Sequence, residues 1–304
     1  MFHEVGLQKN IPYVLHMVPE CKISGELLQQ EIARCINILQ DIGFNVRAVC
    51  CDNHSSNVSA YRGLFKMCNG DYESDLKISF NGKPIYLFYD SVHIMKNLRN
   101  NLLIRKRFLF PPFVSDDLKT SVMVPGGEIS WSLLHRVHEE DTKCKGNIRA
   151  APKLTQQVLH PGKVKQSVPV ALSIFDPTTT AAMLRYFPQA QDSAGFLKLL
   201  HTWWMISNSK QRFNSKNSLG NAAIHGDGKP TFLRKLADWV QEWSQQKLPN
   251  CEKFTLSAQT SAAFVRTLRC HACLIEDLLS DGFSFVQTAR FQSDPIERRY
   301  GQYR

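Results

Sequence analysis

The sequence predicts an α/β layer at its start, followed by a mostly helical region. Apolar runs with the character of strands alternate with segments of helical periodicity over the first hundred or so residues. Two breakers, Pro111-Pro112 and Pro125-Gly126-Gly127, then end this alternation. From residue 128 to about residue 246 the apolar spacing is mainly helical.

The α/β part is predicted element by element from local signals. Ser24 is suited to cap a helix, and Gly43 stands where that helix would end. Each predicted strand is a short run rich in β-branched and aromatic residues. We expect strands at residues 11–18, 44–51 and 85–89, and helices at residues 24–40, 55–67 and 93–104.

The remainder is predicted to be helical up to residue 279. The predicted helices are residues 131–138, 169–187, 195–207, 231–245 and 257–279. A strand is expected at residues 283–287, and a last helix begins near Asp294.

Composition limits the function classes. The chain has 304 residues, a formal net charge of +10 and a pI near 9.2, which suits a polyanionic partner. A solvated face of Arg and Lys is the open alternative. Nine cysteines, an odd number, favour reduced thiols over a disulfide framework. No apolar run is long enough to predict a membrane span, and no secretory leader is expected.

Three carboxylates are candidates for metal chemistry. Asp52 and Asp90 each close an apolar strand, and ligands collect at the carboxyl ends of strands in open α/β sheets. Glu297 lies three residues after Asp294, where the two could also form the start of a helix. A turn aspartate at residue 52 and a capping carboxylate at residue 297 therefore remain structural alternatives.

Five segments stand out in order along the chain: CDNHSSN at 51–57, YDSVHIMKNLRN at 89–100, APKLT at 151–155, FTLSAQTS at 254–261 and RFQSDPIERRYGQYR at 290–304. Together they resemble motifs of P-element-type transposases, and in particular the THAP-domain-containing transposase-like proteins. The segment at 51–57 is also similar to hAT-type transposases. In the segment at 89–100, Ser91 stands where the family usually has proline.

The resemblance implies a ribonuclease-H-like core, a mixed sheet flanked by helices, interrupted by a mostly α-helical insertion domain. It places the core in residues 1–112 and 246–304 and the insertion in residues 113–245. It also implies cut-and-paste DNA cleavage and strand transfer with two Mg²⁺ or Mn²⁺ ions. By motif, Asp52 and Glu297 would be catalytic metal ligands, with Asp90, Asp294 and His93 as accessory residues.

The insertion resembles a guanine-nucleotide-binding domain that does not use a P-loop. Lys153, Trp204 and Asn208 are the candidate contacts for GTP. Met205 stands where the family has an aspartate, and Trp204 could equally be a core aromatic residue.

The chain departs from the family at its start. The family's first catalytic aspartate lies upstream of the strand that residues 11–18 resemble, so the chain is expected to be N-terminally truncated. We therefore expect little or no DNA cleavage by this chain alone. The alternative to an active transposase fragment is a domesticated or inactive DNA- or protein-binding protein. The resemblance further implies DNA as partner, a homo-oligomer and a nuclear location.

Overall fold

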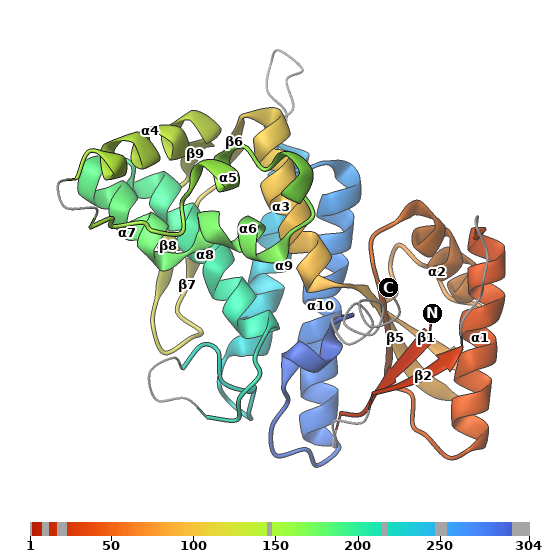
Figure 1. Ribbon diagram of the computed structural model, residues 1–304. Coiled ribbons are helices and arrows are strands. Elements are labelled where there is room, and N and C mark those ends of the chain that lie inside the picture. The colour runs from red at the N-terminus through yellow and green to blue at the C-terminus, as the bar shows by residue number, and fades with distance from the viewer. Residues whose placement is uncertain are drawn as a thin grey trace.

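A three-stranded mixed sheet lies at the centre of the N-terminal half (Figure 1). The computed structural model describes residues 2–7, 12–16, 23–144, 148–213, 218–246 and 254–293. The strand order is β3 (Ala48–Cys51), β5 (Lys83–Tyr89), β4 (Lys77–Phe80). β3 runs parallel to β5, whereas β4 is antiparallel to it, so the prediction of a mixed sheet is confirmed.

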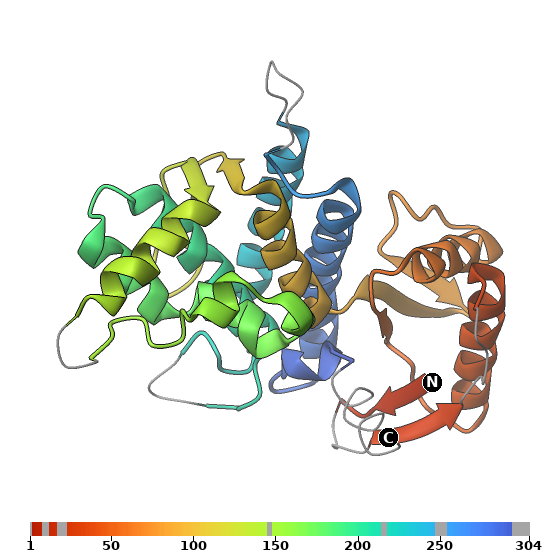
Figure 2. The same ribbon diagram turned by 45° about the horizontal axis from the view of Figure 1, so that its top comes forward.

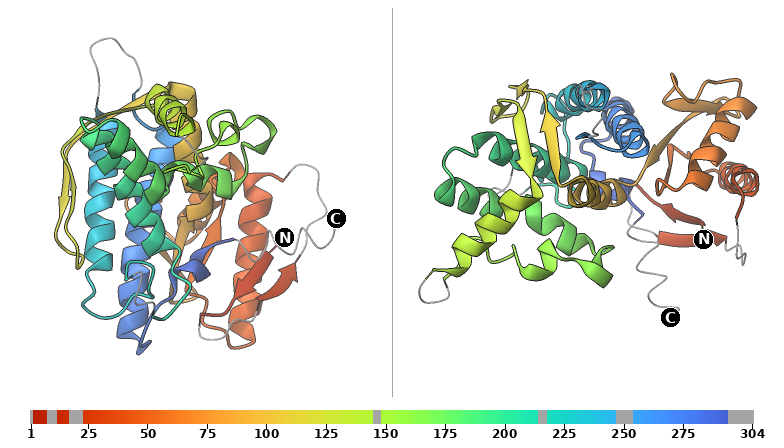
Figure 3. Two further views of the ribbon diagram at one scale, coloured as in Figure 1. Left: turned by 60° about the vertical axis from the view of Figure 1, so that its left-hand side comes forward. Right: turned by 90° about the horizontal axis from the view of Figure 1, so that it is seen from above.

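Helices cover both faces of this sheet (Figure 3). On one face lie α1 (Gly25–Asp41) and α2 (Ser55–Met67), and on the other lies α10 (Ala258–Ser280). Ser24 caps α1 as predicted, its hydroxyl accepting a hydrogen bond from Leu27 N at 3.1 Å. α2 is fastened by the Tyr61 hydroxyl, which lies 2.9 Å from the carbonyl oxygens of both Val49 in β3 and Phe88 in β5.

The helical half is joined to the sheet through α3 (Ser91–Arg105) (Figure 2). α9 (Lys229–Gln245) packs along α10. Aromatic rings fill the space that these two helices share with the strand β6 (Arg107–Phe110) and with α8 (Gln191–Ser207). Trp243 lies 5.2 Å from Phe108 and 5.6 Å from Phe196, between ring centroids. The helices here are α4 (Trp131–Thr142), α5 (Gln156–Leu159), α6 (Val168–Leu172), α7 (Pro177–Tyr186), α8 (Gln191–Ser207) and α9 (Lys229–Gln245).

The strand expected at residues 11–18 is confirmed as β2 (Pro12–His16), whereas β4 and several other short strands were not predicted from the sequence. Three antiparallel pairs contain these short strands: β1 (Phe2–Val5) with β2, β6 (Arg107–Phe110) with β9 (Gly127–Ser130), and β7 (Phe113–Ser115) with β8 (Val122–Val124). The last two pairs contain or adjoin the proline- and glycine-rich breakers. Gly126, with φ of 83°, provides the turn between β8 and β9.

Two predicted elements are corrected. The single helix expected at 169–187 is broken at Asp176, because Pro177 cannot continue the preceding hydrogen-bond ladder and instead begins α7. The strand expected at 283–287 is reduced to one bridge between Val286 and Ala223. The boundaries proposed between core and insertion stay predictions. Within the described part of the chain, no helix is long and apolar enough to span a bilayer.

Candidate active site at the carboxyl edge of the sheet

Asp52 and Asp90 lie next to each other at one edge of the sheet. Cys51 of β3 is paired with Tyr89 of β5, so the two aspartates are the next residues of two parallel neighbours. The Asp90 N–H donates to the Cys51 carbonyl at 2.8 Å, which continues the ladder by one bond. The edge where Asp52 and Asp90 meet is the one at which α/β sheets bind ligands.

The Asp52 side chain is oriented by its own motif. It is half-buried, and its Oδ1 accepts hydrogen bonds from Asn57 Nδ2 at 2.7 Å and from the His54 N–H at 2.9 Å. Asn57 Nδ2 also lies 3.2 Å from the Asp52 carbonyl oxygen. Among the described residues no donor reaches Oδ2, so this oxygen is available to a ligand.

A reciprocal pair of amide contacts joins this motif to the start of α10. Asn53 Nδ2 donates to the Gln259 carbonyl at 3.1 Å, and Gln259 Nε2 donates to the Asn53 carbonyl at 2.7 Å. Two of the five motif segments are therefore in direct contact although they are about 200 residues apart. The sequence marked Gln259 within a motif but gave no signal of this role.

Asp90 has a different environment. It is fully buried, and burial raises the pKa of its carboxyl group. Oδ1 accepts from the Val92 N–H at 2.8 Å and caps α3, while Oδ2 accepts from the Ser293 N–H at 3.3 Å and from the Ser293 hydroxyl. Both oxygens are thus engaged with protein donors. The accessory role at a metal stays a prediction for Asp90. His93, in the first turn of α3, is half-buried, and its Nε2 lies 3.4 Å from Lys96 Nζ.

Glu297 and Asp294, the other predicted acidic residues, lie outside the described residues. The description ends at Ser293, which contacts Asp90. In the described ranges, no three His, Cys, Asp or Glu side chains are grouped so that they could hold a metal ion. The predicted Mg²⁺ site thus stays a prediction.

The three residues predicted to contact a nucleotide differ in their burial and in their partners. Lys153 Nζ is 2.7 Å from Asp176 Oδ2, so its ammonium is already paired with a carboxylate. Trp204 is only 7% exposed within the core, which agrees with the core-aromatic alternative. Asn208 caps the end of α8, and its buried Oδ1 has no partner among the described groups.

The segment that carries Lys153 is held by a buried carboxylate that sequence reasoning missed. Asp141 accepts hydrogen bonds from Ala150 N at 2.7 Å, Tyr186 OH at 2.9 Å, and Ala151 N and Arg149 Nε, both at 3.1 Å. Burial acts to raise the pKa of Asp141, but these four donors outweigh it and lower the pKa. The charged carboxylate therefore fixes the path of the chain just before the APKLT segment.

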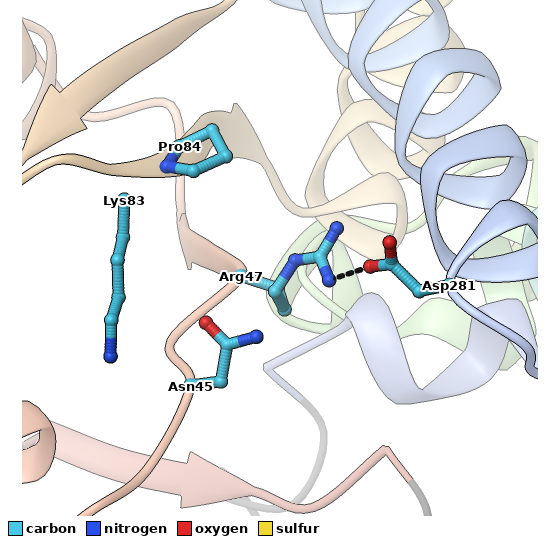
Figure 4. Close-up of a pocket in the computed structure, with 5 residues that line it drawn as sticks. All are labelled: Asn45, Arg47, Lys83, Pro84 and Asp281. Carbon is cyan, nitrogen blue, oxygen red and sulfur yellow. Dashed lines mark hydrogen bonds and ion pairs between the residues drawn. The ribbon is translucent and has the colours of Figure 1, made fainter.

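A surface pocket lies at the opposite edge of the sheet (Figure 4). Its lining residues are Asn45, Arg47, Lys83, Pro84 and Asp281. Arg47 forms an ion pair with Asp281 from the end of α10. Because Lys83 begins β5 whereas Asp90 follows its end, this pocket is separate from the acidic edge.

Comparisons with known proteins bear on the fold of the chain. Residues 1–65, which include Asp52, match the family described as TNP-like, RNase H N-terminal domain. No curated protein compared matches the chain in sequence. The solved structure described as the Drosophila P element transposase strand transfer complex is similar over 98% of this chain, with a TM-score of 0.77 and 17% sequence identity.

The chain has the fold of a P-element-type transposase. The resemblance predicted from the five motif segments is confirmed, and with it the ribonuclease-H-like character of the sheet. The chain spans 62% of the length of the Drosophila transposase.

Proposed function

We propose that this chain is part of a P-element-type DNA transposase that performs cut-and-paste cleavage and strand transfer with a metal-dependent acidic site. The observation that carries the proposal is the Asp52 carboxylate. One of its oxygens is fixed by Asn57 and the His54 N–H, while the other is open at the carboxyl edge of a ribonuclease-H-like sheet. A rigid, partly desolvated carboxylate of this kind is suited to bind a hard cation.

Asp52 and Glu297 would hold the metal. The contact between Ser293 and Asp90 fixes the chain four residues before Glu297, and four residues reach at most about 14 Å. This short length of chain supports the proposal that Glu297 joins Asp52 at this edge. When bound, a divalent ion would stabilise charge on the attacking and leaving oxygens. Asn57 orients Asp52, and Asp90 sets the position at which the acidic segment begins.

DNA is the proposed partner, bound mainly through phosphate contacts. The neighbouring structure is titled a strand transfer complex, and the net charge of this chain is +10. The basic run at residues 99–107 contributes less than its sequence implies. Arg99 is fully buried and donates to the Lys165 carbonyl at 2.6 Å, and Arg107 lies 3.6 Å from Glu128. A homo-oligomer, a nuclear location and a GTP site remain parts of this proposal.

Metal binding tests the proposal most simply. Titration of the purified chain with Mn²⁺, followed by electron paramagnetic resonance, should show a site that Asp52→Asn weakens at least about tenfold, because one ligand oxygen loses its charge. Asp238→Asn is the control, since the Asp238 side chain is 70% exposed and forms an ion pair between α9 and α10 with Arg269. Equal Mn²⁺ affinity in the wild type and Asp52→Asn would contradict the assignment of Asp52.

A salt titration tests the DNA partner. Affinity for a duplex of arbitrary sequence should fall steeply between about 50 and 200 mM salt, and should depend little on sequence. No binding at low salt, or binding that does not change with salt, would favour the alternative in which the basic residues form a solvated surface.

A further inference from the structure

The segment of residues 286–293, here called the strap, connects three separate parts of the fold. The strap begins at an antiparallel bridge, in which Val286 and Ala223 exchange hydrogen bonds of 2.8 Å. Midway, Arg290 Nη1 donates to the Gly6 carbonyl at 2.8 Å, beside the end of β1. The strap contains one short 3₁₀ turn, Thr288–Phe291, and makes most of its other hydrogen bonds with other elements of the fold.

The strap is bound tightly to the end of α8. The Ser209 N–H donates to Thr288 Oγ1 at 3.1 Å, and the Thr288 N–H donates to Ser209 Oγ at 3.0 Å. The Ala289 N–H donates to the Ser209 carbonyl at 3.2 Å, and Gln292 Nε2 donates to the Ser207 carbonyl at 3.0 Å. Thr288, Ser209 and Gln292 are all buried. Buried hydrogen bonds of this kind are typical of a fixed junction rather than of a surface loop.

The other end of the strap is bound to the acidic edge. Phe291 is buried against Phe88 of β5, with ring centroids 6.1 Å apart. Ser293 donates from both its N–H and its hydroxyl to Asp90 Oδ2. Asp90 in turn caps α3 and follows the strand next to Asp52. The strap is therefore hydrogen-bonded to the end of α8 on one side and to the edge that carries Asp52 on the other.

We propose that Thr288, Ser293 and Asp90 are positioning residues, which make the end of α8 and the acidic edge move as one body. Their role in metal binding rests on the proposed function, whereas the mechanical connection does not. Loosening the strap at Thr288 would then change the acidic edge, although Thr288 does not touch it. A residue that only stabilised its own surroundings would have no such remote effect.

Amide hydrogen exchange tests the mechanical connection. Thr288→Val keeps the shape of the side chain but removes its hydroxyl, whereas Thr288→Ser keeps the hydroxyl. Thr179→Val is a matched control, because Thr179 is also fully buried and its hydroxyl donates to the Ser173 carbonyl at 2.9 Å within α7 and its flank. Thr288→Val should speed exchange in the first turns of α3 about tenfold, and Thr288→Ser should restore it. Unchanged exchange in α3 with Thr288→Val would overturn the proposal.

The Mn²⁺ titration separates this inference from the proposed function. If the positioning role and the metal site are both correct, Thr288→Val weakens Mn²⁺ binding about tenfold, because the residues that support a metal ligand affect its affinity. This loss should appear well below the unfolding temperature of the variant. Thr179→Val should leave Mn²⁺ affinity unchanged. Loss of affinity in Asp52→Asn but not in Thr288→Val would refute the positioning role alone. Faster exchange in Thr288→Val, with Asp52→Asn leaving Mn²⁺ binding unchanged, would refute the metal site and retain the strap.

Discussion

A buried histidine gives this protein a specific sensitivity to acid. His271 of α10 is fully buried between Phe88 and Phe291, whose ring centroids lie 4.8 and 5.2 Å from its own. Neither ring nitrogen has a hydrogen-bond partner among the described groups. Burial lowers the pKa of His271 to about 3, because nothing in this apolar site compensates the charge of an imidazolium.

The size of the effect follows from linkage. His271 stays neutral in the folded protein, while in the unfolded chain it binds a proton below a pKa of about 6.5. Its contribution to the free energy of unfolding is therefore complete above pH 6.5 and is lost as the pH falls toward 3, by about 1.4 kcal/mol per pH unit. Between pH 7.5 and pH 5.0 the loss is about 2 kcal/mol.

Urea denaturation at these two pH values measures this loss. His271→Leu removes the titrating group and the unpartnered nitrogens. From pH 7.5 to pH 5.0, its free energy of unfolding should therefore fall by about 2 kcal/mol less than that of the wild type. His271→Gln provides a second, polar comparison that cannot titrate. Equal pH dependence of the free energy of unfolding in the wild type and both variants would rule out this role of His271. It would mean that His271 is protonated equally in the folded and the unfolded protein.

Three further predictions concern stability, each measured as the midpoint of thermal or urea unfolding. Gly228→Ala should lower the free energy of unfolding by well over the roughly 1 kcal/mol expected for Gly226→Ala. Both glycines have a positive φ, but only a Cβ at residue 228 would lie 1.8 Å from the Asp117 carbonyl oxygen. Equal losses in the two variants would contradict this. Tyr61→Phe should lose about 1–2 kcal/mol, because two strand carbonyls lose their shared donor, and no loss would refute the role of that hydroxyl. Asp141→Asn should lower the free energy of unfolding by about 3 kcal/mol or more, because an amide replaces a fully buried carboxylate that accepts from four donors. A loss under about 1 kcal/mol would contradict the importance of that network.

Most of the α/β layer could be predicted from the sequence because its signals are local. Ser24 caps α1, the apolar residues of β5 are contiguous, and Asp52 follows its strand directly. The short strands β1, β4 and β6 to β9 could not be predicted in this way. Strands such as Phe113–Ser115 are three residues long, and their pairing depends on a partner across a turn.

The candidate site was predictable only in part, for the same reason. Asp52 and Asn57 are five residues apart, so a single motif contains the contact that orients the carboxylate. The partners of Asp90 and Asn53, by contrast, are Ser293 and Gln259, each more than 200 residues away. The burial of Arg99 and Trp204 likewise depends on packing between helices that are distant in sequence.

In the proposed function, Asp52 and Glu297 converge on a shared divalent ion. A crystal structure of the chain grown with Mn²⁺ would test this convergence, since anomalous scattering locates the ion. We expect an ion coordinated by oxygens of both carboxylates at about 2.1 Å, with Asp52 still bound by Asn57. Carboxylates of Asp52 and Glu297 more than about 15 Å apart would contradict it, because no single ion could contact both.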